Sequence, residues 1–140
     1  MSQVLDRNIR ALEQTQPLTA SSIPQTQDDP NLQWQSSRSG HLVPVVTVAS
    51  NGTRWVHSRY DPVREADQVA RKTPDSALIV IIGIGAGYQI RAILREHPTA
   101  GILVLESSVS AVRSVLDRID LEDVFGSPRV RLAVGEGDLD

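Results

Sequence analysis

The chain has 140 residues, of which 40% are hydrophobic and 22% charged, and its net charge is −3. This length buries one core of ordinary size, and the absence of cysteine excludes disulfides, thiolate metal sites and cysteine nucleophiles. The basic residues are scattered and the histidines lie far apart, so we predict neither a nucleic-acid partner nor a metal site. Without a signal peptide or an apolar run of about 18 residues, we expect a cytoplasmic protein that does not bind membranes.

The first 40 residues predict a short helix followed by a flexible linker. Leu5, Ile9 and Leu12 recur with helical spacing, and Pro17 ends the pattern. Residues 19–40 are rich in Ser, Thr, Gln, Asp and Pro, which is typical of a loop. A structureless stretch of this length is uncommon inside a compact domain, so we expect the helix to be an appendage.

Residues 41–76 predict a β-hairpin and a helix. The pair Asn51-Gly52 separates two β-branched segments, residues 42–49 and 53–58, which is a strong hairpin signal. Asp61 and Pro62 are a suitable cap and first residue for a helix that ends near residue 73. The helix is expected to bury a stripe of small and aliphatic residues: Val63, Ala66, Val69 and Ala70.

From residue 77 the pattern is typical of a Rossmann-like α/β unit. Strands are expected at residues 77–82, 101–105 and 129–134, with helices at 88–97 and after Ser107 or Ser108. The first strand is continuously apolar, which predicts that both of its faces are covered. Right-handed crossovers give a parallel three-stranded half with the order 3-2-1, preceded by the hairpin and the N-terminal helix. We expect the hairpin to pair with this sheet or pack on it, and the hairpin or a second copy to close the first strand's edge.

The turn between the first strand and its helix contains the candidate ligand-binding residues. Glycines let the backbone approach a ligand, and the helix N-terminus attracts anions. An acidic residue at the end of the second strand accepts hydrogen bonds from ribose hydroxyls in dinucleotide and adenosyl sites. The candidates are Gly83, Gly85, Gly87, Tyr88 and Glu106.

Two features of this turn argue against well-known enzyme classes, and no catalytic residue can be assigned. Tyr88 stands where the nicotinamide fingerprint has its third glycine, and Ile81 stands where methyltransferases usually have an acid. The glycines could equally serve close packing between helix and strand, with Glu106 as a solvated strand end. No histidine–acid pair supports a nucleophilic serine.

Two stretches resemble the motility-associated factor glycosyltransferases. The first is Asn51-Gly52 followed by His-Ser-Arg-Tyr-Asp-Pro at residues 57–62 and by Glu65-Ala66. The second is Ile-Gly-Ile-Gly-Ala-Gly-Tyr at residues 82–88, followed by a strand that ends in Leu105-Glu106. Archaeal 6-hydroxymethylpterin diphosphokinases share the glycine turn.

The resemblance implies a longer protein that transfers a nonulosonic sugar from a CMP-activated donor to flagellin in the bacterial cytoplasm. Its transfer residues are expected downstream, so this chain looks like an N-terminal, non-catalytic domain, with a CMP-type nucleotide or nucleotide-sugar as the candidate ligand. The expected partners are downstream domains, flagellin and a second copy of the chain. The alternatives are a domain that binds S-adenosylmethionine, as in methyltransferases, and a scaffold without ligand.

Overall fold

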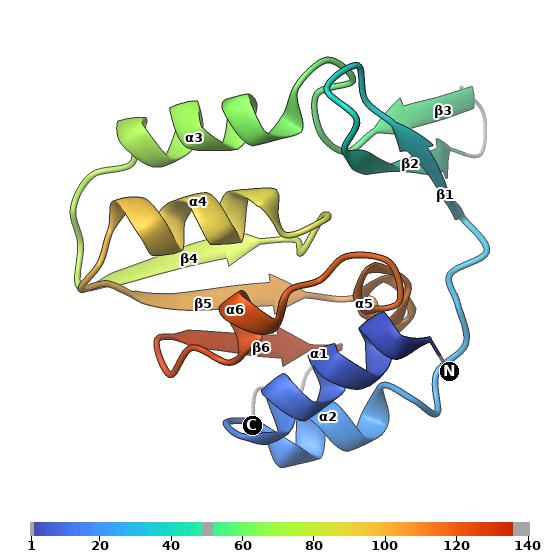
Figure 1. Cartoon of the computed structure of the whole chain (residues 1–140), viewed down its shortest axis with the longest axis horizontal. Coiled ribbons are helices and arrows are strands. Elements are labelled where there is room, and N and C mark those ends of the chain that lie inside the picture. Colours follow the sequence, from blue (N-terminus) through green and yellow to red (C-terminus); the bar gives the residue numbers. More distant parts are fainter. Residues whose placement is uncertain (1, 49–51, 136–140) are drawn as a thin grey trace.

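The computed structural model describes residues 2–48 and 52–135, which form two three-stranded sheets and their helices (Figure 1). One sheet is antiparallel and has the order β1-β2-β3, and the other is parallel and has the order β4-β5-β6. The strands are β1 (Leu32–Ser36), β2 (Leu42–Val48), β3 (Gly52–Trp55), β4 (Leu78–Ile82), β5 (Gly101–Glu106) and β6 (Val130–Val134). The helices are α1 (Gln3–Glu13), α2 (Pro17–Ser22), α3 (Pro62–Lys72), α4 (Tyr88–Glu96), α5 (Val109–Leu116) and α6 (Glu122–Phe125).

The parallel sheet has the predicted Rossmann-like topology. β4, α4, β5, α5 and β6 follow one another, and both strand pairs are parallel. One face of this sheet is buried in the core, where its side chains contact the helices; the residues on it are Ile79, Ile102, Val104, Val130 and Leu132. The carboxyl ends of the three strands therefore meet at one edge, which is where ligands bind in open α/β sheets.

The predicted hairpin is confirmed as β2 paired with β3, from Val45 opposite Trp55 to Val48 opposite Gly52. Its turn at Asn51 lies outside the described residues. β1 adds a third strand that the sequence pattern did not predict, pairing with β2 along its whole length. This strand lies in the stretch interpreted as linker, because Leu32 and Trp34 are its only large apolar residues.

The N-terminal segment packs on the Rossmann-like unit rather than extending away from it. Leu5 and Leu12 of α1 are fully buried, and the side chain of Asn8 donates to the carbonyls of Leu116 and Ile119. Further along, the carboxylate of Asp28 accepts two hydrogen bonds from the guanidinium of Arg118, which lowers the pKa of Asp28. The expected linker is thus held at the end of α5, and it contains most of α2 and all of β1.

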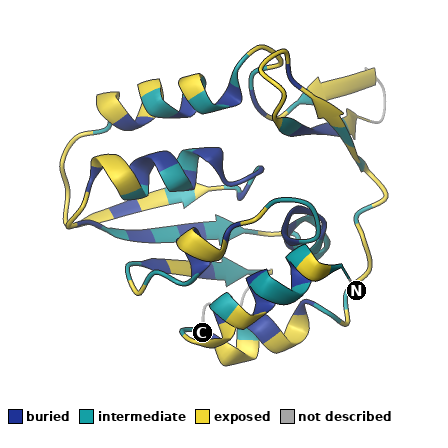
Figure 2. Cartoon of the chain, in the orientation of Figure 1, coloured by how far each residue is buried: buried dark blue, intermediate teal, exposed yellow. Residues whose placement is uncertain are grey.

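The prediction that β4 is covered on both faces is wrong. Leu78, Val80 and Ile82 are 58%, 49% and 85% exposed, whereas Ile79 is 8% exposed. Figure 2 shows this alternation along β4. Right-handed crossovers place α4 and α5 on the same face of the sheet, so the other face of β4 stays open. The hairpin does not close the edge of β4, because it belongs to a separate sheet.

The helix predicted after Asp61 is confirmed as α3, and the side chain of Asp61 caps it by accepting from the N–H of Arg64. Its buried stripe is narrower than the expected one, and Val63 is only partly buried. Ala66 and Ala70 are buried, but Val69 is 41% exposed. The narrow stripe of small residues suits close packing against α4, the helix that α3 contacts most.

Candidate functional site

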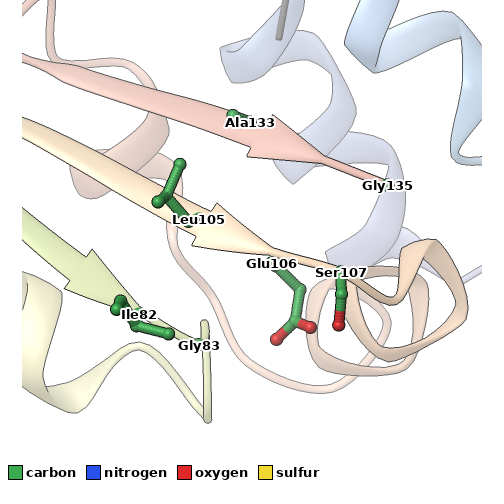
Figure 3. Close-up of a pocket in the computed structure, with 7 residues that line it drawn as sticks. All are labelled: Ile82, Gly83, Leu105, Glu106, Ser107, Ala133 and Gly135. Carbon is green, nitrogen blue, oxygen red and sulfur yellow. The ribbon is translucent and has the colours of Figure 1, made fainter. Parts of the chain in front are cut away.

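A hollow of about 460 Å³ lies at the carboxyl ends of the three parallel strands (Figure 3). We call it the carboxyl-edge hollow; its lining residues are Ile82, Gly83, Leu105, Glu106, Ser107, Ala133 and Gly135. The residues from β4, β5 and β6 make its wall largely aliphatic, while Glu106 and Ser107 provide oxygen atoms that point into the space below the strand ends. A carboxylate beside apolar walls suits a ligand with hydroxyl groups.

The three glycines of the turn have positive φ angles of +89° at Gly83, +53° at Gly85 and +84° at Gly87. Their surroundings differ. A Cβ at Gly85 would lie 2.5 Å from Nε2 of His57, and one at Gly87 would lie 2.6 Å from a methyl carbon of Leu121. A Cβ at Gly83 would meet no atom within 4 Å, because this glycine borders the hollow. Close packing therefore explains Gly85 and Gly87, whereas Gly83 faces open space.

Two backbone amides of this turn are occupied by side chains. The N–H of Ala86 donates to Nε2 of His57 at 2.9 Å, and the N–H of Ile84 donates to Oε1 of Glu106 at 3.1 Å. An amide that already has an acceptor cannot bind a phosphate without losing that bond. In this structure the turn thus offers less to a phosphate than the sequence motif alone indicates.

His57 is buried and accepts its hydrogen bond as a neutral ring. Because Nε2 is the acceptor, the proton of the neutral ring is on Nδ1, which has no hydrogen-bond partner among the described residues. Burial lowers the pKa of His57, and the nearby carboxylate of Glu65 opposes this in part. His57 thus connects the segment after β3 to the glycine turn.

Glu106 connects the two loops that follow β4 and β5. Its Oε1 accepts from Ile84, and its Oε2 accepts from the N–H of Ser108 at 3.0 Å. Each carboxylate oxygen has a second lone pair, so Glu106 can still accept hydrogen bonds from ligand hydroxyls. It is also the one ionisable side chain among the described residues that line the hollow.

Tyr88 points toward the antiparallel sheet rather than into the hollow. It is 7% exposed, its hydroxyl donates to the carbonyl of Leu42 at 2.6 Å, and its ring meets that of His57 edge-on at 5.2 Å. Burial raises the pKa of the Tyr88 hydroxyl. Of the five sequence candidates, Gly83 and Glu106 line the carboxyl-edge hollow, while Gly85, Gly87 and Tyr88 contact other parts of the protein.

Sequence reasoning did not single out His57, Ser107 or Gly135 as site residues. The residues around His57 in the sequence give no signal for a site. Only its hydrogen bond with the N–H of Ala86, 29 positions away, gives it a role. Ser107 and Gly135 follow β5 and β6 directly, so their position just after two parallel strands was the available signal. Across residues 2–48 and 52–135, no group of three or more His, Cys, Asp or Glu side chains could hold a metal ion.

Comparison with known proteins gives one likeness of fold. The solved structure of a MAf glycosyltransferase from Magnetospirillum magneticum AMB-1 matches 96% of this chain and 27% of that chain, with a TM-score of 0.63 and 14% identity. No family model and no curated protein matches. The chain therefore has the fold of part of a MAf glycosyltransferase, while the resemblance to pterin diphosphokinases stays a prediction. None of the described helices is long and apolar enough to cross a membrane.

Proposed function

We propose that this chain is the N-terminal, non-catalytic domain of a flagellin glycosyltransferase-like protein, and that its carboxyl-edge hollow binds a nucleotide. The observation that carries the proposal is the position of Glu106, which borders the hollow where β5 ends in a fold like that of a MAf glycosyltransferase. We propose a cytoplasmic location, with flagellin and the downstream domains of a longer polypeptide as partners.

The geometry favours the ribose as the part of the ligand that Glu106 binds. The second lone pairs of its carboxylate can accept both hydroxyls of a ribose diol. The amides of Ile84 and Ala86 are occupied, so we place the phosphate end of the nucleotide away from the turn. A CMP-type nucleotide and S-adenosylmethionine both contain a ribose diol, and the two are therefore compared directly in the test.

Recognition fits this hollow better than group transfer. Transfer chemistry needs a base or an electrophilic group held against the acceptor. Within the described part of the chain, the hollow offers one ionisable group, Glu106, and both of its oxygens already accept backbone N–H groups. We therefore expect no sugar or methyl transfer by this chain alone. Transfer by the purified chain above that of a heat-inactivated sample would contradict the proposal.

A scaffold without ligand is the second candidate function, and the internal hydrogen bonds favour it. Glu106 and His57 together bind three backbone N–H groups, so the turn is stable without any ligand. Under this alternative, Glu106 only holds two loops together, and the hollow is filled by water.

Calorimetric titration with CMP, a CMP-sugar and S-adenosylmethionine separates these candidates. If the hollow binds one of them, Glu106→Ala should weaken binding by about 1–3 kcal/mol through the loss of a charge-assisted hydrogen bond. Glu106→Gln keeps the shape of the side chain but turns an N–H₂ toward one of the two backbone donors, so urea unfolding of both variants checks that each is folded. Glu96→Ala removes an exposed carboxylate at the other end of the sheet and should leave the affinity unchanged. No binding of any of the three ligands would favour the scaffold.

A further inference from the structure

A second, mainly apolar cavity of about 240 Å³ lies between the two sheets. We call it the inter-sheet cavity. Its aliphatic walls come from both sides: Leu32, Pro44 and Val46 from the antiparallel sheet, and Ile84, Ala111 and Val115 from the Rossmann-like unit. The segment that forms β1 therefore completes a cavity that the Rossmann-like unit lacks by itself.

This cavity adjoins the carboxyl-edge hollow, because Gly83 and Glu106 line both of them. Gly83 leaves the space beside it empty, since even an added Cβ would touch nothing within 4 Å. A molecule whose hydroxyl groups bind to Glu106 can therefore extend into the inter-sheet cavity on one side and into the carboxyl-edge hollow on the other.

The size and lining of the inter-sheet cavity fit a flat ring. An apolar cavity of about 150 Å³ is known to accept benzene, and this one is larger. Its polar lining includes Asp29 and Asn31, and Oδ1 of Asp29 accepts from the N–H of Asn31 at 2.9 Å. The carboxylate of Asp29 keeps acceptor capacity for an amino group and has no N–H for a ring carbonyl, which among these two residues only the side-chain amide of the exposed Asn31 has.

We infer that the inter-sheet cavity binds the heterocyclic base of a nucleoside, and that it prefers a base with an exocyclic amino group. The apolar walls cover the two faces of the ring, Asp29 accepts from its amino group, and Glu106 accepts from the ribose. This inference rests on the proposed nucleotide binding and adds to it the part of the ligand that determines specificity.

The first experiment compares cytidine, uridine and ribose 5-phosphate by calorimetry. We expect cytidine to bind about tenfold more tightly than uridine, which corresponds to the ~1.4 kcal/mol of one additional hydrogen bond. Asp29→Asn replaces half of the acceptor with a donor, so this preference should disappear. Equal affinities of the wild-type chain for cytidine and uridine would contradict the role of Asp29.

A cavity-filling variant separates base binding from ribose binding. Ala111→Leu adds three carbon atoms to the α5 wall and should lower the affinity for cytidine about tenfold, the equivalent of ~1.4 kcal/mol. Its affinity for ribose 5-phosphate should stay that of the wild type. Ser21→Leu adds a leucine to the exposed surface of α2 and controls for added bulk. Unchanged binding of cytidine by a folded Ala111→Leu variant would overturn the inference while leaving nucleotide binding intact.

A fragment experiment tests the cavity without any ribose. We expect 2-aminopyrimidine at millimolar concentration to raise the Tm of the wild-type chain, and to leave the Tm of Ala111→Leu unchanged, because a ring can enter only the unfilled cavity. If no nucleoside and no ribose phosphate binds, the proposed function fails, and this fragment result alone decides about the cavity. The absence of a shift in the wild-type Tm would overturn the inference.

Discussion

The two sides of the parallel sheet differ in how they are closed. On the β6 side, the side-chain amide of Gln16 pairs with the backbone of Leu132 through two hydrogen bonds of 2.7 Å, as a neighbouring strand would. On the β4 side, the side chains of Leu78, Val80 and Ile82 are exposed on one face of the sheet. The N–H of Gly83 and the carbonyl of Ala77 point inward to β5, so by alternation Leu78, Val80 and Ile82 turn their backbone groups outward.

The difference indicates that closure of this sheet depends on segments distant in sequence. Gln16 closes the β6 edge, His57 binds the turn after β4, and α1 covers α5 and α6. Nothing comparable covers the open face of β4 within the described residues. Parallel sheets are normally covered on both faces, and natural edge strands usually have charged residues or proline. β4 has neither, which makes it the surface where we expect a second polypeptide.

The largest effect is expected where the glycine turn meets the antiparallel sheet. Gly85→Ala introduces a Cβ that displaces His57, so the buried N–H of Ala86 loses its acceptor. Together with the positive φ angle, we expect a loss of about 3 kcal/mol of unfolding free energy. Gly83→Ala has a positive φ angle but no steric conflict, and should lose only about 1–2 kcal/mol. Urea unfolding measures both, and equal losses would show that the contact with His57 does not close the turn.

Removing the side-chain amide of Gln16 from the β6 edge should have the next largest effect on stability. Gln16→Leu leaves the buried N–H and carbonyl of Leu132 without partners, and we expect the free energy of unfolding to fall by about 2–3 kcal/mol. Gln14→Leu changes an exposed glutamine of the same segment and should stay within about 0.5 kcal/mol of the wild type. If both variants unfold at the same urea concentration, the closed edge contributes nothing to stability.

Sequence reasoning found the parts of the fold that have local signals. The apolar segments of β4 and β5, the glycine turn after Ile82 and the Asp61 cap of α3 can each be identified from a few adjacent residues. The same holds for the strands on either side of Asn51-Gly52, which a turn-forming pair separates.

The parts that were missed depend on contacts across the chain. Gln16 pairs with Leu132 over 116 positions, and no pattern around either residue indicates this. Sequence alone could not show that only one face of β4 is covered either, because its five residues are aliphatic throughout. In the candidate site, two of the five residues named from the sequence, Gly83 and Glu106, line the hollow. The occupation of the turn amides by side chains became visible only in three dimensions.

The hydrogen bond between His57 and the N–H of Ala86 should make the free energy of unfolding depend on pH. Because burial lowers the pKa of His57 in the folded protein, the unfolded chain takes up a proton first as the pH falls below 6.5. The contribution of His57 is therefore fully present above pH 6.5 and decreases below it, by at most about 1.4 kcal/mol per pH unit. His57→Gln keeps an acceptor without titrating. In urea unfolding at a series of pH values, its free energy of unfolding should therefore vary less between pH 6.5 and 5 than that of the wild type. The carboxylates of Asp28 and Asp123, whose pKa values are lowered, affect stability only at more acidic pH. If the free energies of unfolding of the wild type and of His57→Gln change equally with pH, this role of His57 is contradicted.

Substitution on the exposed face of β4 should have the smallest effect on stability and the clearest effect on association between copies of the chain. In a solution of this chain alone, only a second copy can cover the exposed residues of β4, and we expect association through this surface. Val80→Lys places a charge at its centre, where Val80 is 49% exposed and contributes little to the core. The free energy of unfolding should change by only about 0.5 kcal/mol, because no buried contact is lost.

Sedimentation over a range of concentrations measures the association directly. The wild-type chain should become heavier with concentration, while Val80→Lys should stay monomeric, because a desolvated ammonium group strongly opposes contact between apolar surfaces. Leu18→Lys is the matched control, since Leu18 is 74% exposed on α2, on the closed side of the sheet, and its replacement should leave association unchanged. If Leu18→Lys disrupts association as much as Val80→Lys, then association depends on net charge or uses a surface other than β4. A wild-type chain that is monomeric at all concentrations would show that the open face of β4 does not bind a second copy.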